Sequence, residues 1–148
     1  GLTPGELRAL STSDVRLPRA GSGTPCRLQV PASASTPARE TPVAPWATRL
    51  LRRWLEQREA LAIPGPMLLP STRSSGKPWG KVAQYNATAA VLAEAGLADV
   101  TGGSFRLRHT FALRQLRRGT AEHEVARWLG VSDPAVMARY RGVLAAPR

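Results

Sequence analysis

Single glycines divide the second half of the sequence into amphipathic segments, and this division restricts the fold more than any other feature. Gly96, Gly119 and Gly130 each follow a stretch in which apolar residues recur every three or four positions. A glycine directly after such a stretch is typical of a helix C-terminus, where the backbone often turns left-handed. The pattern predicts helices over residues 82–95 and 105–118, a helix that Thr120 caps, and a last helix that Ser132 caps and that carries Tyr140.

The first half of the sequence predicts two helices and a small amount of strand. Residues 3–6 combine a capping threonine, a proline and an acid, which is a helix-start pattern. Apolar and polar residues alternate twice within residues 14–31, around a turn, which predicts an antiparallel hairpin. Residues 32–42 predict a loop, and residues 44–61 an amphipathic helix. We therefore expect one domain over residues 1–148, mainly α with a small N-terminal antiparallel β-hairpin, an α+β fold.

The net charge indicates which partner to expect. The 148 residues include 21 basic and 10 acidic side chains, a net charge of +11, and all the basic residues except Lys77 and Lys81 are arginines. A small domain this basic is attracted to polyanions, and arginines that neutralise phosphates release counterions. Nucleic acid is therefore the first candidate partner. The alternative is that a GC-rich genome simply favours arginine codons.

Composition disfavours several other classes of protein. No apolar run approaches the roughly 20 residues that span a bilayer, and the start lacks the basic and apolar regions of a signal peptide. Cys26 is the only cysteine, which excludes an internal disulfide and fits a reducing compartment such as the cytoplasm. Two histidines and one cysteine at unrelated spacings do not predict a zinc site. We expect no metal, no cofactor and no membrane association.

The C-terminal third carries the strongest family resemblance. Residues 106–112 read R-L-R-H-T-F-A, residues 128–130 read W-L-G, and Arg139-Tyr140 follows them. In this order they resemble the segments "H-x-L-R-H-T-F-A" and "L-G-H-S-x-x-x-T-x-x-R-Y" in the catalytic domain of tyrosine recombinases, the phage-integrase family. Residues 1–10 resemble the family's "G-L-R-x-x-E-L-x-x-L", and residues 21–31 its "G-K-G…R-x-V-P". Together the resemblance covers nearly the whole chain.

The resemblance implies a tyrosine-recombinase fold, double-stranded DNA as the partner, and a role in DNA integration and site-specific recombination without a metal or cofactor. In this family a tyrosine hydroxyl attacks a DNA phosphodiester and forms a covalent 3′-phosphotyrosine, while arginines bind the non-bridging oxygens of the transition state. By position Tyr140 is the nucleophile, Arg108 contacts the scissile phosphate, and His109 is a possible third member. The expected DNA-binding side chains are Arg106, Arg139, Arg141, Lys77 and Lys81.

Four positions at which the family keeps a catalytic group carry other residues in this sequence. Thr3 stands for the first arginine, Ser22 for the strand-turn lysine, Phe105 for the first histidine of the central motif, and Val131 for the histidine after L-G. Removing one oxyanion-type donor typically lowers a rate by ~10²–10³. Because Thr3 has no charge and Phe105 and Val131 cannot transfer a proton, we expect weak or absent strand cleavage.

Other interpretations of the sequence remain open. Residues 125–141 also read as a helix-turn-helix, in which Tyr140 would only support the packing. The residues that would then face the major groove are Ser132, Asp133, Ala135 and Arg139. The chain could also form homo-oligomers, or act as a non-catalytic partner of active recombinase subunits on DNA. It begins where the family's N-terminal DNA-clamping domain and first helix would end, so we expect both to be absent. The position of Arg108 relative to Tyr140 distinguishes the recombinase site from the helix-turn-helix.

Overall fold

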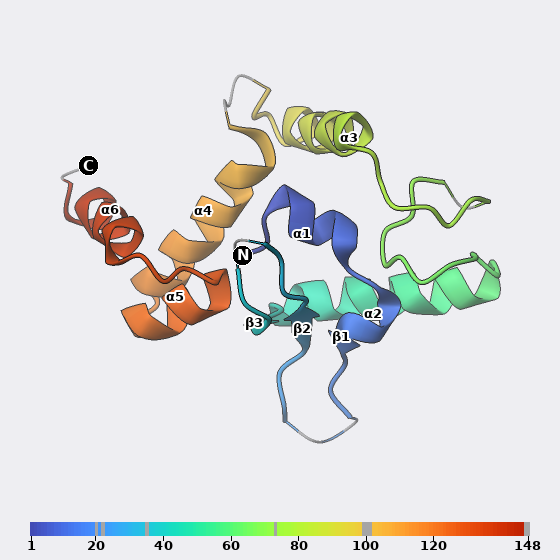
Figure 1. Cartoon of the computed structure of the whole chain (residues 1–148), viewed down its shortest axis with the longest axis horizontal. Coiled ribbons are helices and arrows are strands. Elements are labelled where there is room, and N and C mark those ends of the chain that lie inside the picture. Colours follow the sequence, from blue (N-terminus) through green and yellow to red (C-terminus); the bar gives the residue numbers. More distant parts are fainter. Residues whose placement is uncertain (20, 22, 35, 73, 99–101, 147–148) are drawn as a thin grey trace.

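The computed structural model describes residues 1–19, 21, 23–34, 36–72, 74–98 and 102–146 (Figure 1). Its elements in chain order are α1 (Pro4–Ala9), the 3-10 helix η1 (Thr12–Asp14), β1 (Val15–Arg16), β2 (Arg27–Val30), β3 (Arg39–Pro42), α2 (Pro45–Ala60), α3 (Lys81–Glu94), α4 (Gly103–Arg117), α5 (Glu122–Leu129) and α6 (Pro134–Ala145). This mainly helical chain with a small antiparallel sheet near its start confirms the predicted α+β class.

The helix termini follow local chemistry, with two corrections. Helix α1 begins with a full capping box, in which the Thr3 hydroxyl accepts from the Glu6 amide at 3.2 Å and the Glu6 carboxylate accepts from the Thr3 amide at 2.7 Å. The predicted caps Thr120 and Ser132 are wrong, because α5 and α6 begin one residue later in each case. Asp133 caps α6 by accepting from the Ala135 amide at 2.8 Å. Asp133 takes this role because Pro134 fits the first helical position, where no amide donor is needed.

The sheet has one strand more than the predicted hairpin. Its order is β1-β2-β3, and both strand pairs are antiparallel. Strand β3 falls within residues 32–42, which were predicted to be a loop. The buried face of β3 carries Arg39 and Thr41, whereas Glu40 between them is exposed. Because both buried side chains are polar, the alternation of hydropathy that marks a half-buried strand is missing from the sequence.

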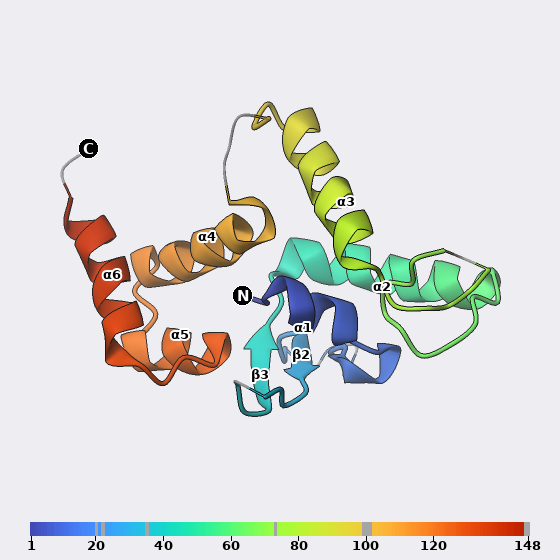
Figure 2. The same ribbon diagram turned by 45° about the horizontal axis from the view of Figure 1, so that its top comes forward.

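Helices α4, α5 and α6 pack together at one end of the molecule (Figures 1 and 2). Their shared core consists of five buried side chains: Ala112, Val125, Leu129, Met137 and Tyr140. The N-terminal half has its own buried side chains, including Leu10, Cys26 and Val30. The segment after α2 joins this half, because the Leu68 amide donates to the Leu10 carbonyl at 2.8 Å.

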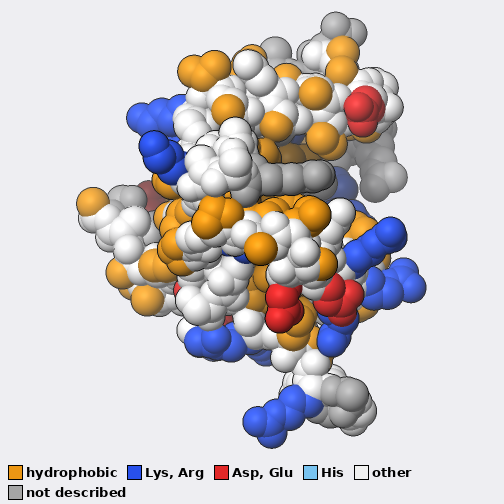
Figure 3. All heavy atoms as spheres, turned by 90° about the vertical axis from the view of Figure 1, so that its right-hand side faces the viewer, with side chains coloured by type: hydrophobic (Ala, Val, Ile, Leu, Met, Phe, Trp, Pro, Cys, Tyr) orange, Lys and Arg blue, Asp and Glu red, His pale blue; other side chains and the backbone are white. Residues whose placement is uncertain are grey.

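Part of the apolar surface stays exposed. On α2, Trp54 is partly buried and its indole N–H donates to the Leu68 carbonyl at 2.8 Å, whereas Trp46 and Leu50 are 58% and 61% exposed. Figure 3 shows hydrophobic side chains at the surface beside basic and acidic ones, on the face that includes α3. Over the described residues, none of the helices combines the length and apolar character that a bilayer span requires.

Candidate active site at the contact of α4 and α6

Tyr140 lies where α6 packs on α4. Its side chain belongs to the core of the three C-terminal helices and is 7% exposed. The hydroxyl is 2.8 Å from Nδ1 of His109 on α4, and the two rings are tilted with centroids 5.8 Å apart. The structure therefore brings together two of the three residues that the motif singles out. A hydroxyl on an imidazole nitrogen is an arrangement from which a proton can be transferred.

Arg108 is the neighbour of His109 on α4 and points in a different direction. Its guanidinium donates to the Gly1 carbonyl and, at 2.6 Å, to the Leu129 carbonyl. It also lies 3.7 Å from the Glu6 carboxylate, and its side chain is 10% exposed. Arg108 is thus held by protein acceptors, although it is near enough to Tyr140 for its charge to influence the tyrosine hydroxyl.

A buried ion-pair network connects Arg108 to β3. Arg39 donates to both carboxylate oxygens of Glu6, at 2.7 and 2.9 Å, and to the Trp128 carbonyl at 2.9 Å. The carbonyls of Trp128 and Leu129 belong to the last residues of α5, where helix carbonyls lack intrahelical partners and the dipole is negative. Arg39 and Arg108 therefore donate to two carbonyls at the C-terminus of α5, and Glu6 provides one negative charge beside the two arginines.

Sequence reasoning did not find this network. Glu6 and Arg39 are 33 residues apart, and Arg39 lies in a segment predicted to be a loop. The only local signal was Glu6 itself, which belongs to the opening motif. The motif does not show that Arg39 and Arg108 are its partners.

Burial and charge act against each other on the ionisable groups of the site. Burial raises the pKa of Tyr140, and the nearby charge of Arg108 offsets only part of this increase. Burial likewise lowers the pKa of Arg108, against the opposing charge of Glu6. For Glu6, burial acts to raise the pKa, but the hydrogen bonds from Arg39 and Thr3 together with the Arg39 charge outweigh it, so the pKa is lowered. Tyr140 is therefore a neutral hydroxyl near pH 7, and an attack by its oxygen requires a base.

Two of the four positions at which this chain departs from the family pattern, Thr3 and Val131, have structural roles. Thr3 caps α1. Phe105 is in the first turn of α4 and is 52% exposed. Val131 follows α5 and packs against the C-terminal core. Ser22 lies outside the described residues.

The five predicted DNA-binding side chains are exposed but come from different parts of the chain. Arg106 is on α4, Arg139 and Arg141 are on α6, Lys81 begins α3, and Lys77 is in the loop before it. Arg141 forms an ion pair with Glu122 of α5. The structure does not gather these residues on a single element.

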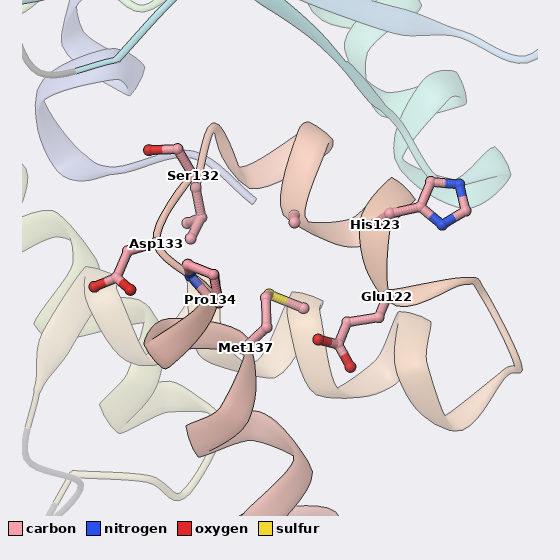
Figure 4. Close-up of a pocket in the computed structure, with 8 residues that line it drawn as sticks. Glu122, His123, Ser132, Asp133, Pro134 and Met137 are labelled. Carbon is pink, nitrogen blue, oxygen red and sulfur yellow. The ribbon is translucent and has the colours of Figure 1, made fainter.

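A cavity of about 410 Å³ lies between α5 and α6 (Figure 4). The acidic residues Glu122 and Asp133 are part of its lining, whereas Tyr140 and Arg108 are not. Within the described part of the chain, no three side chains of histidine, cysteine, aspartate or glutamate come together as they would around a metal ion.

Comparison with known proteins identifies the fold. No protein-family model matches the sequence, and neither does any curated protein. Three solved structures are similar to this chain. XerA recombinase has a TM-score of 0.76 at 23% identity over 97% of this chain and 52% of its own. XerH site-specific recombinase, bound to difH substrate in a pre-cleavage complex, has a TM-score of 0.74 at 19% identity over 94% and 38%. The Tn1549 transposon integrase, in complex with transposon right end DNA, has a TM-score of 0.65 at 18% identity over 99% and 51%.

These similarities confirm the tyrosine-recombinase fold that the motifs predict. The chain spans 38% to 52% of the length of the three structures.

Proposed function

We propose that this chain, which has the fold of tyrosine recombinases, binds DNA and takes part in DNA integration or site-specific recombination, with Tyr140 at the nucleophile position and weak or absent cleavage. The hydrogen bond between the Tyr140 hydroxyl and His109 Nδ1 carries the proposal. It joins two residues, one from each of two separate motif segments, within a fold shared with DNA-bound recombinases. A tyrosine that served only to fill the core would also need a hydrogen-bond partner, but here that partner is a residue of the other motif segment.

The charge of the chain supports DNA as the partner. With a net charge of +11, the domain would be attracted to the phosphate backbone regardless of sequence. Each phosphate contact adds about 0.9 to the slope of log affinity against log salt concentration for duplex DNA. Binding should therefore weaken steeply as salt is raised.

The proposed reaction uses the hydroxyl of Tyr140 as nucleophile. Its oxygen bonds to the scissile phosphorus, the bond from phosphorus to the 5′ oxygen breaks, and the tyrosine proton passes to Nδ1 of His109. A tyrosine is protonated near pH 7, and burial raises the pKa of Tyr140 further, so this base is needed. The leaving 5′ oxygen also requires a proton, and neither Phe105 nor Val131 can provide it.

Two structural features add to the effect of the missing catalytic groups. Arg108 is occupied by the carbonyls of Gly1 and Leu129 and by Glu6, so a phosphate must compete with these acceptors. Tyr140 is 7% exposed, so little of its side chain is open to a phosphate in this structure. Both features should slow cleavage without preventing DNA binding.

A nicked suicide substrate tests the nucleophile. A duplex library with a nick near each possible cleavage position would trap a protein–DNA adduct, which is detected on a denaturing gel. We expect little adduct from the natural chain, and none from Tyr140→Phe. Tyr85→Phe is the matched control, because Tyr85 is the second tyrosine of the chain and is 66% exposed.

The outcomes separate the alternatives. An abundant adduct lost only in Tyr140→Phe would contradict the impaired activity but support the recombinase site. Sequence-specific binding that depends on Arg139, without any adduct, would favour the helix-turn-helix of α5 and α6. If this chain takes part in strand cleavage only after an active recombinase is added to the reaction, the result would favour a non-catalytic partner. No DNA binding at low salt would refute the proposal as a whole.

A further inference from the structure

A second cavity lies between α1, α3 and the first turn of α4. Its volume is about 440 Å³, within the range of roughly 300–1,000 Å³ that small-molecule sites occupy. Its lining includes the start of α4 (residues 102–105), Arg8 of α1, and Lys81, Gln84 and Tyr85 of α3.

The floor of this cavity contains a buried amide with an unused donor. Gln84 is 1% exposed, and its Oε1 accepts from Arg8 at 2.6 Å. Its Nε2 has no hydrogen-bond partner among the described residues. A buried donor without an acceptor is costly, so a ligand oxygen that reached Nε2 would be bound favourably.

The rim of the cavity favours an anion. Arg8 and Lys81 contribute two positive charges. The first turn of α4 adds backbone N–H groups that have no intrahelical acceptor, and the N-cap residue Gly102 provides no side-chain cap. Amides at a helix N-terminus together with the positive end of the helix dipole form a binding site for phosphate.

Two aromatic rings stand at the same cavity. Tyr85 is 66% exposed and Phe105 is 52% exposed, although both line it. The Tyr85 ring lies beside the backbone of Gly103, where a Cβ would be 3.9 Å from Cε2. Exposed aromatic rings beside cationic side chains are the arrangement that stacks unpaired nucleobases. Phe105 is also the residue that replaces a family histidine, so the same substitution that depletes the reaction chemistry adds a stacking surface.

We propose that this cavity binds one unpaired nucleotide, with its base against Tyr85 and Phe105 and its phosphate near Arg8, Lys81 and the N-terminus of α4. Phe105 precedes His109 by one helical turn, about 6 Å along the axis, so the bound nucleotide would lie beside the candidate active site. The proposal rests on the proposed DNA-binding function for its biological source. A displaced nucleotide of a DNA strand and a free nucleotide have the same chemistry, and the test separates them.

The test compares three probes by fluorescence anisotropy and calorimetry. They are a fully paired duplex, the same duplex with one unpaired adenine, and free deoxyadenosine monophosphate. Stacking on an aromatic side chain changes affinity by roughly 5- to 150-fold per base. We expect the duplex with the unpaired adenine to bind at least about fivefold more tightly than the paired duplex, and Tyr85→Ala to abolish this preference while leaving affinity for the paired duplex unchanged.

Two further variants define the controls. Trp46→Ala removes an aromatic ring of similar exposure outside the cavity and should leave the preference intact. Gln84→Glu keeps an acceptor for Arg8 but replaces the amide donor by an acceptor, and should reduce the preference. Circular dichroism of each variant establishes that the fold is retained.

Each outcome decides the proposal. Equal affinity for the two duplexes, with normal binding to the paired one, overturns the nucleotide site and leaves the proposed function standing. If neither duplex binds, the binding of free deoxyadenosine monophosphate is the test. Binding that depends on Tyr85 supports a site for a free nucleotide, and absence of binding overturns the proposed site. A preference that survives in Tyr85→Ala also overturns it.

Discussion

Replacing Glu6 with alanine tests whether the buried network holds the two halves of the molecule together. Glu6 accepts two hydrogen bonds from Arg39 and lies 3.7 Å from Arg108, and these side chains are 3% and 10% exposed. Without Glu6 both guanidinium groups remain buried with no neutralising charge. Removing one partner of a buried ion pair typically costs about 3–5 kcal/mol. The variant should therefore lose a large part of the roughly 5–15 kcal/mol that stabilises an ordinary domain.

Urea unfolding followed by circular dichroism measures this loss. With a slope near ~2 kcal/mol per molar urea, a loss of about 4 kcal/mol lowers the midpoint by about 2 M. Glu40→Ala is the matched control, because Glu40 pairs with Arg27 at 3.7 Å on the exposed face of the same sheet. An exposed pair contributes about 0.2–1 kcal/mol. If Glu6→Ala costs no more than Glu40→Ala, the network does not stabilise the fold and the reasoning is wrong.

The pH dependence gives a second measurement of the same interaction. The pKa of Glu6 in the folded chain is lowered from its ordinary value of 4.5, so folding favours the carboxylate. Its contribution to stability is therefore fully present above about pH 4.5 and is lost as the pH falls through the folded-state value. The difference in unfolding free energy between the natural chain and Glu6→Gln should narrow over that acidic range, and a constant difference would contradict the assignment.

Three further changes have expected outcomes. Gly130→Ala should destabilise the fold by roughly 1–3 kcal/mol in thermal unfolding, because φ is +68° and a Cβ would lie 3.0 Å from the Arg39 side chain; Gly119→Ala, at φ +83° with open space around it, should cost less. Thr3→Ala removes the cap of α1 and should cost about 1 kcal/mol in urea unfolding, and no loss would mean that the capping box is not formed in solution. Arg139→Ala should lower the salt slope of DNA binding by about 1 without changing sequence preference, and an unchanged slope would remove this residue from the interface.

Local chemistry explains why much of the fold was predictable. The glycines after the amphipathic segments and the cap at Thr3 act within a few residues, so their effects can be recognised without tertiary information. The corrections at Thr120 and Ser132 concern one residue each, because neighbouring positions compete for the same cap. The motifs also singled out His109 and Tyr140 as candidate site residues. In the structure the Tyr140 hydroxyl lies 2.8 Å from Nδ1 of His109.

The features that long-range contacts create were not predictable. Strand β3 has a polar buried face. Burial of its residue Arg39 is explained only by the ion pair with Glu6, which lies 33 positions earlier in the sequence. The sequence likewise did not show where the Arg108 side chain points. An arginine on a helix can face a phosphate, the solvent or the end of a neighbouring helix, and the same sequence pattern fits all three.

The sequence by itself determined most of the helical segments, the basic charge and the motifs that predict a tyrosine-recombinase fold. Only the tertiary structure decided that Arg108 is bound by Glu6 and the carbonyl at the end of α5, and that α1, α3 and α4 enclose a second cavity. The physical reason is that capping and periodicity depend on neighbours along the chain. Ion pairing and cavity formation depend on which distant segments folding brings into contact.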